Sequence, residues 1–166
     1  MEPKAIRPCG ECSKCCQGTL TATVLGQEIG NGKNCSYLGK GGTGCTIHQY
    51  RPRVCKDFIC EWKGNFNVPL NFRPDKTGVI LSTRYFTGSD GNSYEHLRVL
   101  DTNRKINTDV YEWILKQYSL KKFENILYIV RGLGKLPEYG ILTNNKKFYE
   151  QMGKHLGGFD VKDYTK

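Results

Sequence analysis

The stretch CGECSKCC, residues 9–16, places four cysteines in eight positions near the start of the chain. The other four cysteines follow at wider spacing, and none occurs between Glu61 and Lys166. Two residues between cysteines allow one tight turn to direct both sulfurs at a single centre. This asymmetry predicts a sulfur-rich first third and a conventional hydrophobic domain in the remainder of the 166 residues.

Three chemistries could use so many cysteines: disulfides, a redox pair or metal binding. A disulfide framework belongs to secreted proteins, and the N-terminus shows no apolar stretch of signal-peptide length. A redox dithiol needs one C-x2-C pair and leaves six cysteines unexplained. The longest run of aliphatic and aromatic residues, 126–130, is far short of the ~20 needed to cross a bilayer. We therefore expect a cytoplasmic protein without a membrane partner, whose clustered cysteines bind metal.

We interpret all eight cysteines as metal ligands: Cys9, Cys12, Cys15, Cys16, Cys35, Cys45, Cys55 and Cys60. Three cysteines at successive two-residue intervals are typical of an iron–sulfur cluster, and pairs at this interval are equally typical of zinc sites. Because neighbouring side chains diverge, Cys15 and Cys16 either serve two different centres or one supports the other. Eight sulfurs divide into two four-ligand sites, which predicts a [4Fe–4S] cluster plus a second metal, or two zincs. The triple run favours iron–sulfur.

Other polar residues near the cysteines add little chemistry. His48 could replace one sulfur, but eight thiols already suffice. Arg51 could donate to thiolates or pair with Asp57, as residues around metal sites often do. His96 and His155 are expected to be surface or capping residues. Catalytic residues stay unknown, because the sequence has no nucleophile elbow, dinucleotide fingerprint or His-Glu-x-x-His.

The cysteine pattern also resembles a known family. CGECSKCC is followed by CSYL (35–38), GCTIHQYRPRVCKDFIC (44–60) and EW (61–62). In this order the motifs resemble the YkgJ-type cysteine-cluster family, whose members are described as zinc- or iron-chelating domains. Trp62 and Arg73-Pro74-Asp75 also match that family, whereas the four-residue gap between Cys55 and Cys60 is longer than in many members. The resemblance implies metal chelation by residues 9 to about 62.

The pattern predicts an α+β protein in two parts. Residues 1–62 form an irregular, glycine-rich cysteine lobe with one short strand in 19–25, in which metal replaces an apolar core. Residues 63–166 form a small β-β-α-β-β-α domain packed against this lobe, with an antiparallel or mixed sheet. Its expected elements are a hairpin (78–86 and 95–102) turning at Asp90-Gly91, a helix (109–119) capped by Thr108, strands 125–132 and 138–144, and a helix (145–158).

The formal net charge of +9 is spread over both parts. Nucleic-acid faces usually show a basic stripe with aromatic platforms, and the lysines and arginines here form only short pairs. Two four-thiolate metal sites, each carrying about −2, would offset roughly four of the positive charges. The first hypothesis is a metal-binding accessory enzyme for redox or modification chemistry. The alternative is a zinc-stabilised module that binds nucleic acid or protein without catalysis, so the sequence leaves enzyme activity open.

Overall fold

The structure is a computed structural model that describes residues 6–103, 106–131 and 137–157. The chain divides into two compact units, Met1–Ile80 and Leu81–Lys166. We expected the boundary after Trp62, but residues 63–80 belong to the first unit. Arg7 accounts for part of this difference, because its guanidinium donates hydrogen bonds to backbone carbonyls at Trp62 (2.9 Å), Phe66 (3.0 Å) and Val68 (2.9 Å). The segment after Trp62 is thus tied to the start of the chain.

The first unit consists of turns and short elements. In chain order these are η1 (Lys14–Cys16), β1 (Ala22–Val24), β2 (Gln27–Ile29), η2 (Lys40–Gly42), η3 (His48–Tyr50), α1 (Arg53–Asp57), α2 (Glu61–Gly64), η4 (Leu70–Phe72) and α3 (Pro74–Thr77). Strands β1 and β2 form an antiparallel hairpin in which Ala22 pairs with Ile29. The strand expected in 19–25 is therefore present but short. A small core of Val24, Ile29 and Cys35 is buried beside this hairpin.

Gly18 brings two turns of this unit into close approach. Its φ of +67° is cheap only for glycine, and a Cβ there would lie 2.7 Å from the backbone carbonyl carbon of Gly32. The amide of Gly32 donates to the carbonyl of Gly18 at 3.2 Å. Glycine is therefore required here for the chain after η1 to lie against the turn that precedes Cys35.

The second unit has the predicted β-β-α-β-β-α order. Its elements are β3 (Val79–Thr87), β4 (Ser93–Asp101), α4 (Thr108–Ser119), β5 (Asn125–Val130), β6 (Glu138–Thr143) and α5 (Lys146–His155). The strands form one sheet in the order β3-β4-β5-β6, with β4 and β5 parallel and β5 and β6 antiparallel. The sheet is mixed, and α4 supplies the crossover that a parallel pair requires. The α+β class is confirmed.

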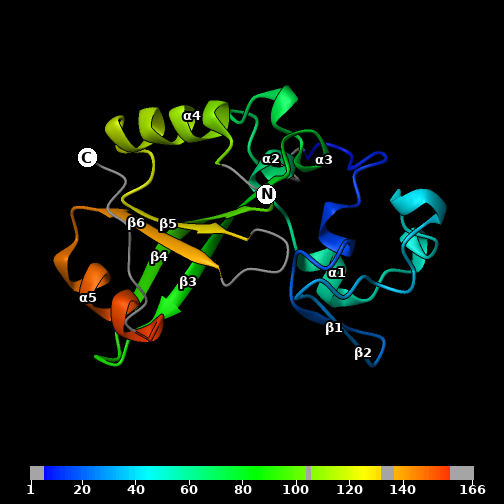
Figure 1. Cartoon of the computed structure of the whole chain (residues 1–166), viewed down its shortest axis with the longest axis horizontal. Helices are drawn as coiled ribbons and strands as arrows, with labels where there is room; N and C mark the ends of the chain where they lie inside the picture. Colours follow the sequence, from blue (N-terminus) through cyan, green and yellow to red (C-terminus); the bar gives the residue numbers. More distant parts are fainter. Residues whose placement is uncertain (1–5, 104–105, 132–136, 158–166) are drawn as a thin grey trace, which may run out of the picture. The chain divides into compact units, whose positions relative to one another are not determined.

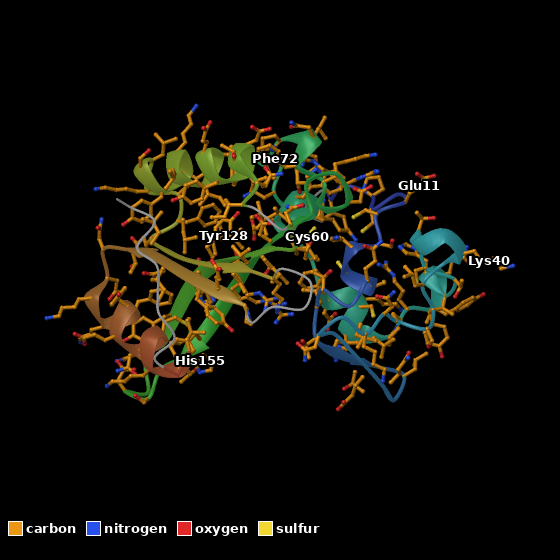
Figure 2. The ribbon with its side chains drawn as sticks, viewed as in Figure 1. Glu11, Lys40, Cys60, Phe72, Tyr128 and His155 are labelled. Carbon is orange, nitrogen blue, oxygen red and sulfur yellow. The ribbon has the colours of Figure 1, made fainter. Side chains whose placement is uncertain are left out.

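The two longer helices cover opposite faces of this sheet (Figure 1). On one face, Tyr111 of α4 meets the ring of Tyr128 at 5.8 Å between centroids, and Tyr128 lies beneath α4 in Figure 2. On the other face, Phe148 of α5 contacts the rings of Tyr94 (6.0 Å) and His96 (5.6 Å). We expected His96 at the surface, but it is 6% exposed because α5 covers it.

Helix α4 is capped by Asn107, one residue before the Thr108 that we expected. The side chain of Asn107 accepts a hydrogen bond from the amide of Val110 at 3.1 Å. The amide of Asn107 in turn donates to the carboxylate of Asp101 at 3.0 Å. Asn and Thr are both favourable N-cap residues, and the hydrogen bond from the Asn107 amide to the buried Asp101 favours Asn107 over Thr108. Helix α5 is capped in the same way by Asn145.

The carboxylate of Asp101 is fully buried at the end of β4 and joins three elements. One oxygen accepts from the amide and the side chain of Asn103 at 2.9 and 2.7 Å. The other accepts from the amide of Asn107 and, at 2.7 Å, from the hydroxyl of Tyr128. The charge is thus satisfied by four donors, as a buried carboxylate requires.

Within the described ranges, no helix is both long and apolar enough to span a membrane.

Candidate metal centre

All eight predicted cysteines lie in the first unit, and all are free thiols. Cys15 and Cys16 are consecutive residues of η1, a single turn of 3₁₀ helix. Successive side chains on such a turn point about 120° apart, because three residues complete the turn. The two sulfurs therefore face different surroundings, and their nearest charged neighbours differ accordingly.

The cysteines whose charges act on Cys15 include Cys60, Cys12 and Cys9, which together with Cys15 we call the outer set; the adjacent Cys16 acts on it as well. Burial raises the pKa of Cys15, and the charges of Cys60 and Cys12 raise it further. Burial also raises the pKa of Cys60, and there the charges of Cys9 and Cys12 add to the effect. Cys9 and Cys12 lie on one turn, in which the amide of Cys12 donates to the carbonyl of Cys9 at 3.1 Å. Cys60 is the residue directly before α2 and is its N-cap (Figure 2).

Cys16 belongs with Cys35, Cys45 and Cys55, which we call the inner set. The pKa of Cys16 is raised to about 11, mainly by burial and then by the charges of Cys45, Cys35, Cys55 and, last, Cys12. The backbone draws the members together, since the amide of Cys35 donates to the carbonyl of Cys16 at 2.8 Å. An isolated β-bridge joins Leu38 to Cys45. Cys16 and Cys55 also pack against the small core that contains Cys35.

The glycine-rich turn before Cys45 is held to η1 by side chains. The hydroxyl of Ser13 and the side-chain amide of Gln17 both donate to the carbonyl of Gly42, at 2.8 and 2.9 Å. Gly42 has a φ of +77°, which favours glycine. These two hydrogen bonds explain how a turn far along the sequence places Cys45 near Cys16.

Backbone amides are directed at two sulfurs of the outer set. Burial raises the pKa of Cys12, while hydrogen bonds from the amides of Lys14 and Asp75 act in the opposite direction. The amide of Lys63 does the same for Cys60. Donors of this kind stabilise a thiolate and are usual around metal-bound sulfur.

Arg73 and Asp75 were not among the predicted site residues, although the sequence contains the signal as Arg73-Pro74-Asp75. Arg73 donates two hydrogen bonds to the carboxylate of Asp75, at 2.6 and 2.8 Å. This pairing lowers the pKa of Asp75, so the acid stays ionised beside Cys12. Pro74 begins α3 and fixes the position of the Asp75 amide that reaches the sulfur.

Two neighbours of the inner set differ from expectation. Asp57 pairs with Arg53 across one turn of α1 at 3.1 Å, whereas Arg51 donates to the carbonyl of His48 at 3.0 Å. The charge of Arg51 nevertheless acts on Cys55, where it partly opposes the rise in pKa that burial causes. His48 itself is exposed in η3.

The thiols of the two sets are typical metal ligands, but they are not positioned as ligands around a metal ion are. In the described part of the chain, no group of three or more His, Cys, Asp or Glu side chains is placed so that it could hold a metal ion. Four thiolates repel one another and converge stably only around a cation. Comparisons with protein-family models, curated proteins and solved structures found no match.

Proposed function

We propose that this chain is a metal-binding protein whose eight cysteines hold two separate centres. Cys9, Cys12, Cys15 and Cys60 would ligate one, and Cys16, Cys35, Cys45 and Cys55 the other. The observation that carries the proposal is that adjacent Cys15 and Cys16 have different leading neighbours, Cys60 and Cys12 for Cys15 but Cys45 and Cys35 for Cys16. A single centre would not use consecutive residues in this way.

The outer set suits a [4Fe–4S] cluster. It contains three cysteines at two-residue intervals and a fourth from a distant element, which is the usual arrangement around such clusters. Amide donors reach two of its sulfurs, and hydrogen bonds to sulfur tune the reduction potential of a cluster. When bound, the cluster would supply one-electron chemistry, which supports an accessory role in a redox or modification reaction.

The inner set suits zinc. Its ligands come from four separated positions around a small apolar core, as in closed structural sites where the metal stabilises the fold. With four thiolates and no open position, zinc here would hold the lobe together rather than catalyse. Eight free thiols also suit the cytoplasm, where cysteines are kept reduced.

Metal analysis of serine variants tests this division. We expect wild-type protein purified without oxygen to contain about four irons with labile sulfide and about one zinc. Cys15→Ser should remove the iron and the absorption near ~400 nm but keep the zinc. Cys16→Ser should remove the zinc and keep the iron. Glu11→Gln is the control, because Glu11 is exposed on the neighbouring turn between Cys9 and Cys12 and is not a thiol.

Two results would contradict the assignment. If Cys15→Ser and Cys16→Ser lose the same metal to the same extent, the eight cysteines serve one shared centre. If the wild-type protein is colourless and holds two zincs, the chain is instead a zinc-stabilised module that binds nucleic acid or protein. In that case both variants should lose one zinc each.

A further inference from the structure

A second candidate site lies in the second unit and is independent of the cysteines. Arg84 of β3 and Arg98 of β4 occupy the sheet face that α5 covers. The rings of Phe86 and Tyr94 stack at 6.4 Å between centroids, and Phe86 also contacts His155 of α5 at 4.8 Å. Side chains alternate along a strand, so Arg84 shares the face of Phe86, and Arg98 shares the face of Tyr94.

Arg131, directly after β5, joins them on this face. Its amide donates to the carbonyl of Asp101 at 2.8 Å, which continues the pairing of β4 with β5 by one residue. Tyr128 points toward α4, and a residue three positions further along an extended strand points to the other side. Three neighbouring strands therefore each contribute one arginine.

The charges of these arginines act on one another. The pKa of Arg98 is lowered to about 10, mainly by burial and also by the positive charges of Arg84 and Arg131. His96 responds in the same way, since burial lowers its pKa and the charges of Arg98 and Arg84 add to the effect. Burial and positive neighbours both disfavour the charged form of Arg98, and an anion bound beside its guanidinium would favour that form.

Two polar atoms beside the arginines have no hydrogen-bond partner among the described residues. They are the Nε of Arg98 and the hydroxyl of Ser82, and both atoms are buried. Ser82 is 2% exposed and lies two residues before Arg84 on the same face of β3. Buried polar groups normally have partners, so these two unsatisfied donors on one face of the sheet indicate a missing acceptor.

We propose that Ser82, Arg84, Arg98 and Arg131, the arginine cluster, bind the terminal phosphate of a small phosphorylated molecule. Guanidinium groups present paired N–H donors that match phosphate oxygens, and a serine hydroxyl adds one more donor. A phosphate monoester carries up to about −2 and three free oxygens. A nucleic-acid backbone phosphate has one negative charge and two free oxygens, and so has a carboxylate. Either group would therefore accept fewer hydrogen bonds from the cluster and neutralise less of its charge.

Titration calorimetry with inorganic phosphate on the full-length protein, at constant ionic strength, tests the proposal. We expect saturable binding to the wild type, and Arg98→Met should weaken it by about 10- to 100-fold, as for loss of a hydrogen-bonded charge. Methionine keeps the length of the buried stem. Lys122→Gln is the control, because Lys122 is exposed near the opposite end of β5 and its loss changes the net charge equally. Its affinity should match the wild type.

Circular dichroism must show that Arg98→Met is folded, and Arg131→Gln provides a second variant with the same expected loss. The proposal is overturned if the wild type does not bind phosphate at millimolar concentration, or if Lys122→Gln weakens binding as much as Arg98→Met. It is also overturned if an oligonucleotide without terminal phosphates competes as well as a phosphate monoester. That outcome would assign the cluster to backbone phosphates instead.

Discussion

Asp101 is the buried group whose loss should cost the second unit most. Asp101→Ala leaves the hydroxyl of Tyr128 buried without an acceptor, at a cost of about 1–3 kcal/mol. The donors of Asn103 and Asn107 are only half-buried and can reach water, so the loss should cost about 1 kcal/mol at each of these two residues. We therefore expect the unit to lose about 3–5 kcal/mol of unfolding free energy, which is in the range of a broken buried network.

Chemical denaturation followed by circular dichroism would measure this loss. Tyr128→Phe removes the hydroxyl that Asp101→Ala leaves without an acceptor. The double variant Asp101→Ala/Tyr128→Phe should therefore lose less unfolding free energy than the sum of the losses in the two single variants. Asp109→Ala is the control, because Asp109 is exposed in the first turn of α4. Its stability should hardly change. If Asp101→Ala unfolds at the wild-type denaturant concentration, the carboxylate does not organise the start of α4 and the reasoning fails.

Three further predictions concern other parts of the chain. Arg7→Met should destabilise the first unit by about 2–4 kcal/mol, because three hydrogen bonds to carbonyls are lost, two of them buried. A limited-proteolysis pattern that stays unchanged around residue 66 would contradict this. The pKa of His96 is lowered on folding, so the stability it contributes is present above pH ~6.5 and is lost as the pH falls. Thermal melts between pH 7.5 and 5 should show this decline in the wild type and a flatter profile in His96→Gln, and equal profiles would refute it. Removing metal with a chelator should expose residues 6–62 to protease, whereas a circular dichroism spectrum and cleavage pattern that stay the same would show that metal does not stabilise this lobe.

Much of the second unit could be predicted because its patterns are local. Alternating apolar strands and the Asp-Gly turn lie within a few residues of the elements they specify. The differences arise where distant groups decide. Asn107 rather than Thr108 caps α4 because Asp101 holds its amide, and residues 63–80 join the first unit in part because Arg7 reaches across to Phe66 and Val68.

The candidate site shows the same limit. Spacing identified the eight cysteines, but spacing alone could not say which four lie together. Cys45 reaches Cys16 through the contacts of Ser13 and Gln17 with Gly42, and no local pattern predicts these. The arginine cluster was missed for a related reason, since its members come from three strands and never form a run of charges in the sequence.

The two cysteine sets are nested, and this has a consequence for the order of metal binding. Every member of the inner set lies between Cys15 and Cys60 of the outer set, which are 45 positions apart. Once the inner set is closed, the loop that the outer set must close shortens to roughly six residues. Loop closure costs about 1.5RT for each unit of ln n, so this shortening saves about 1.8 kcal/mol, or roughly a twentyfold gain in affinity at the outer set. If the two sets bind metal as proposed, metal in the inner set would favour binding at the outer set, and by linkage the outer metal would stabilise the inner one with the same coupling energy.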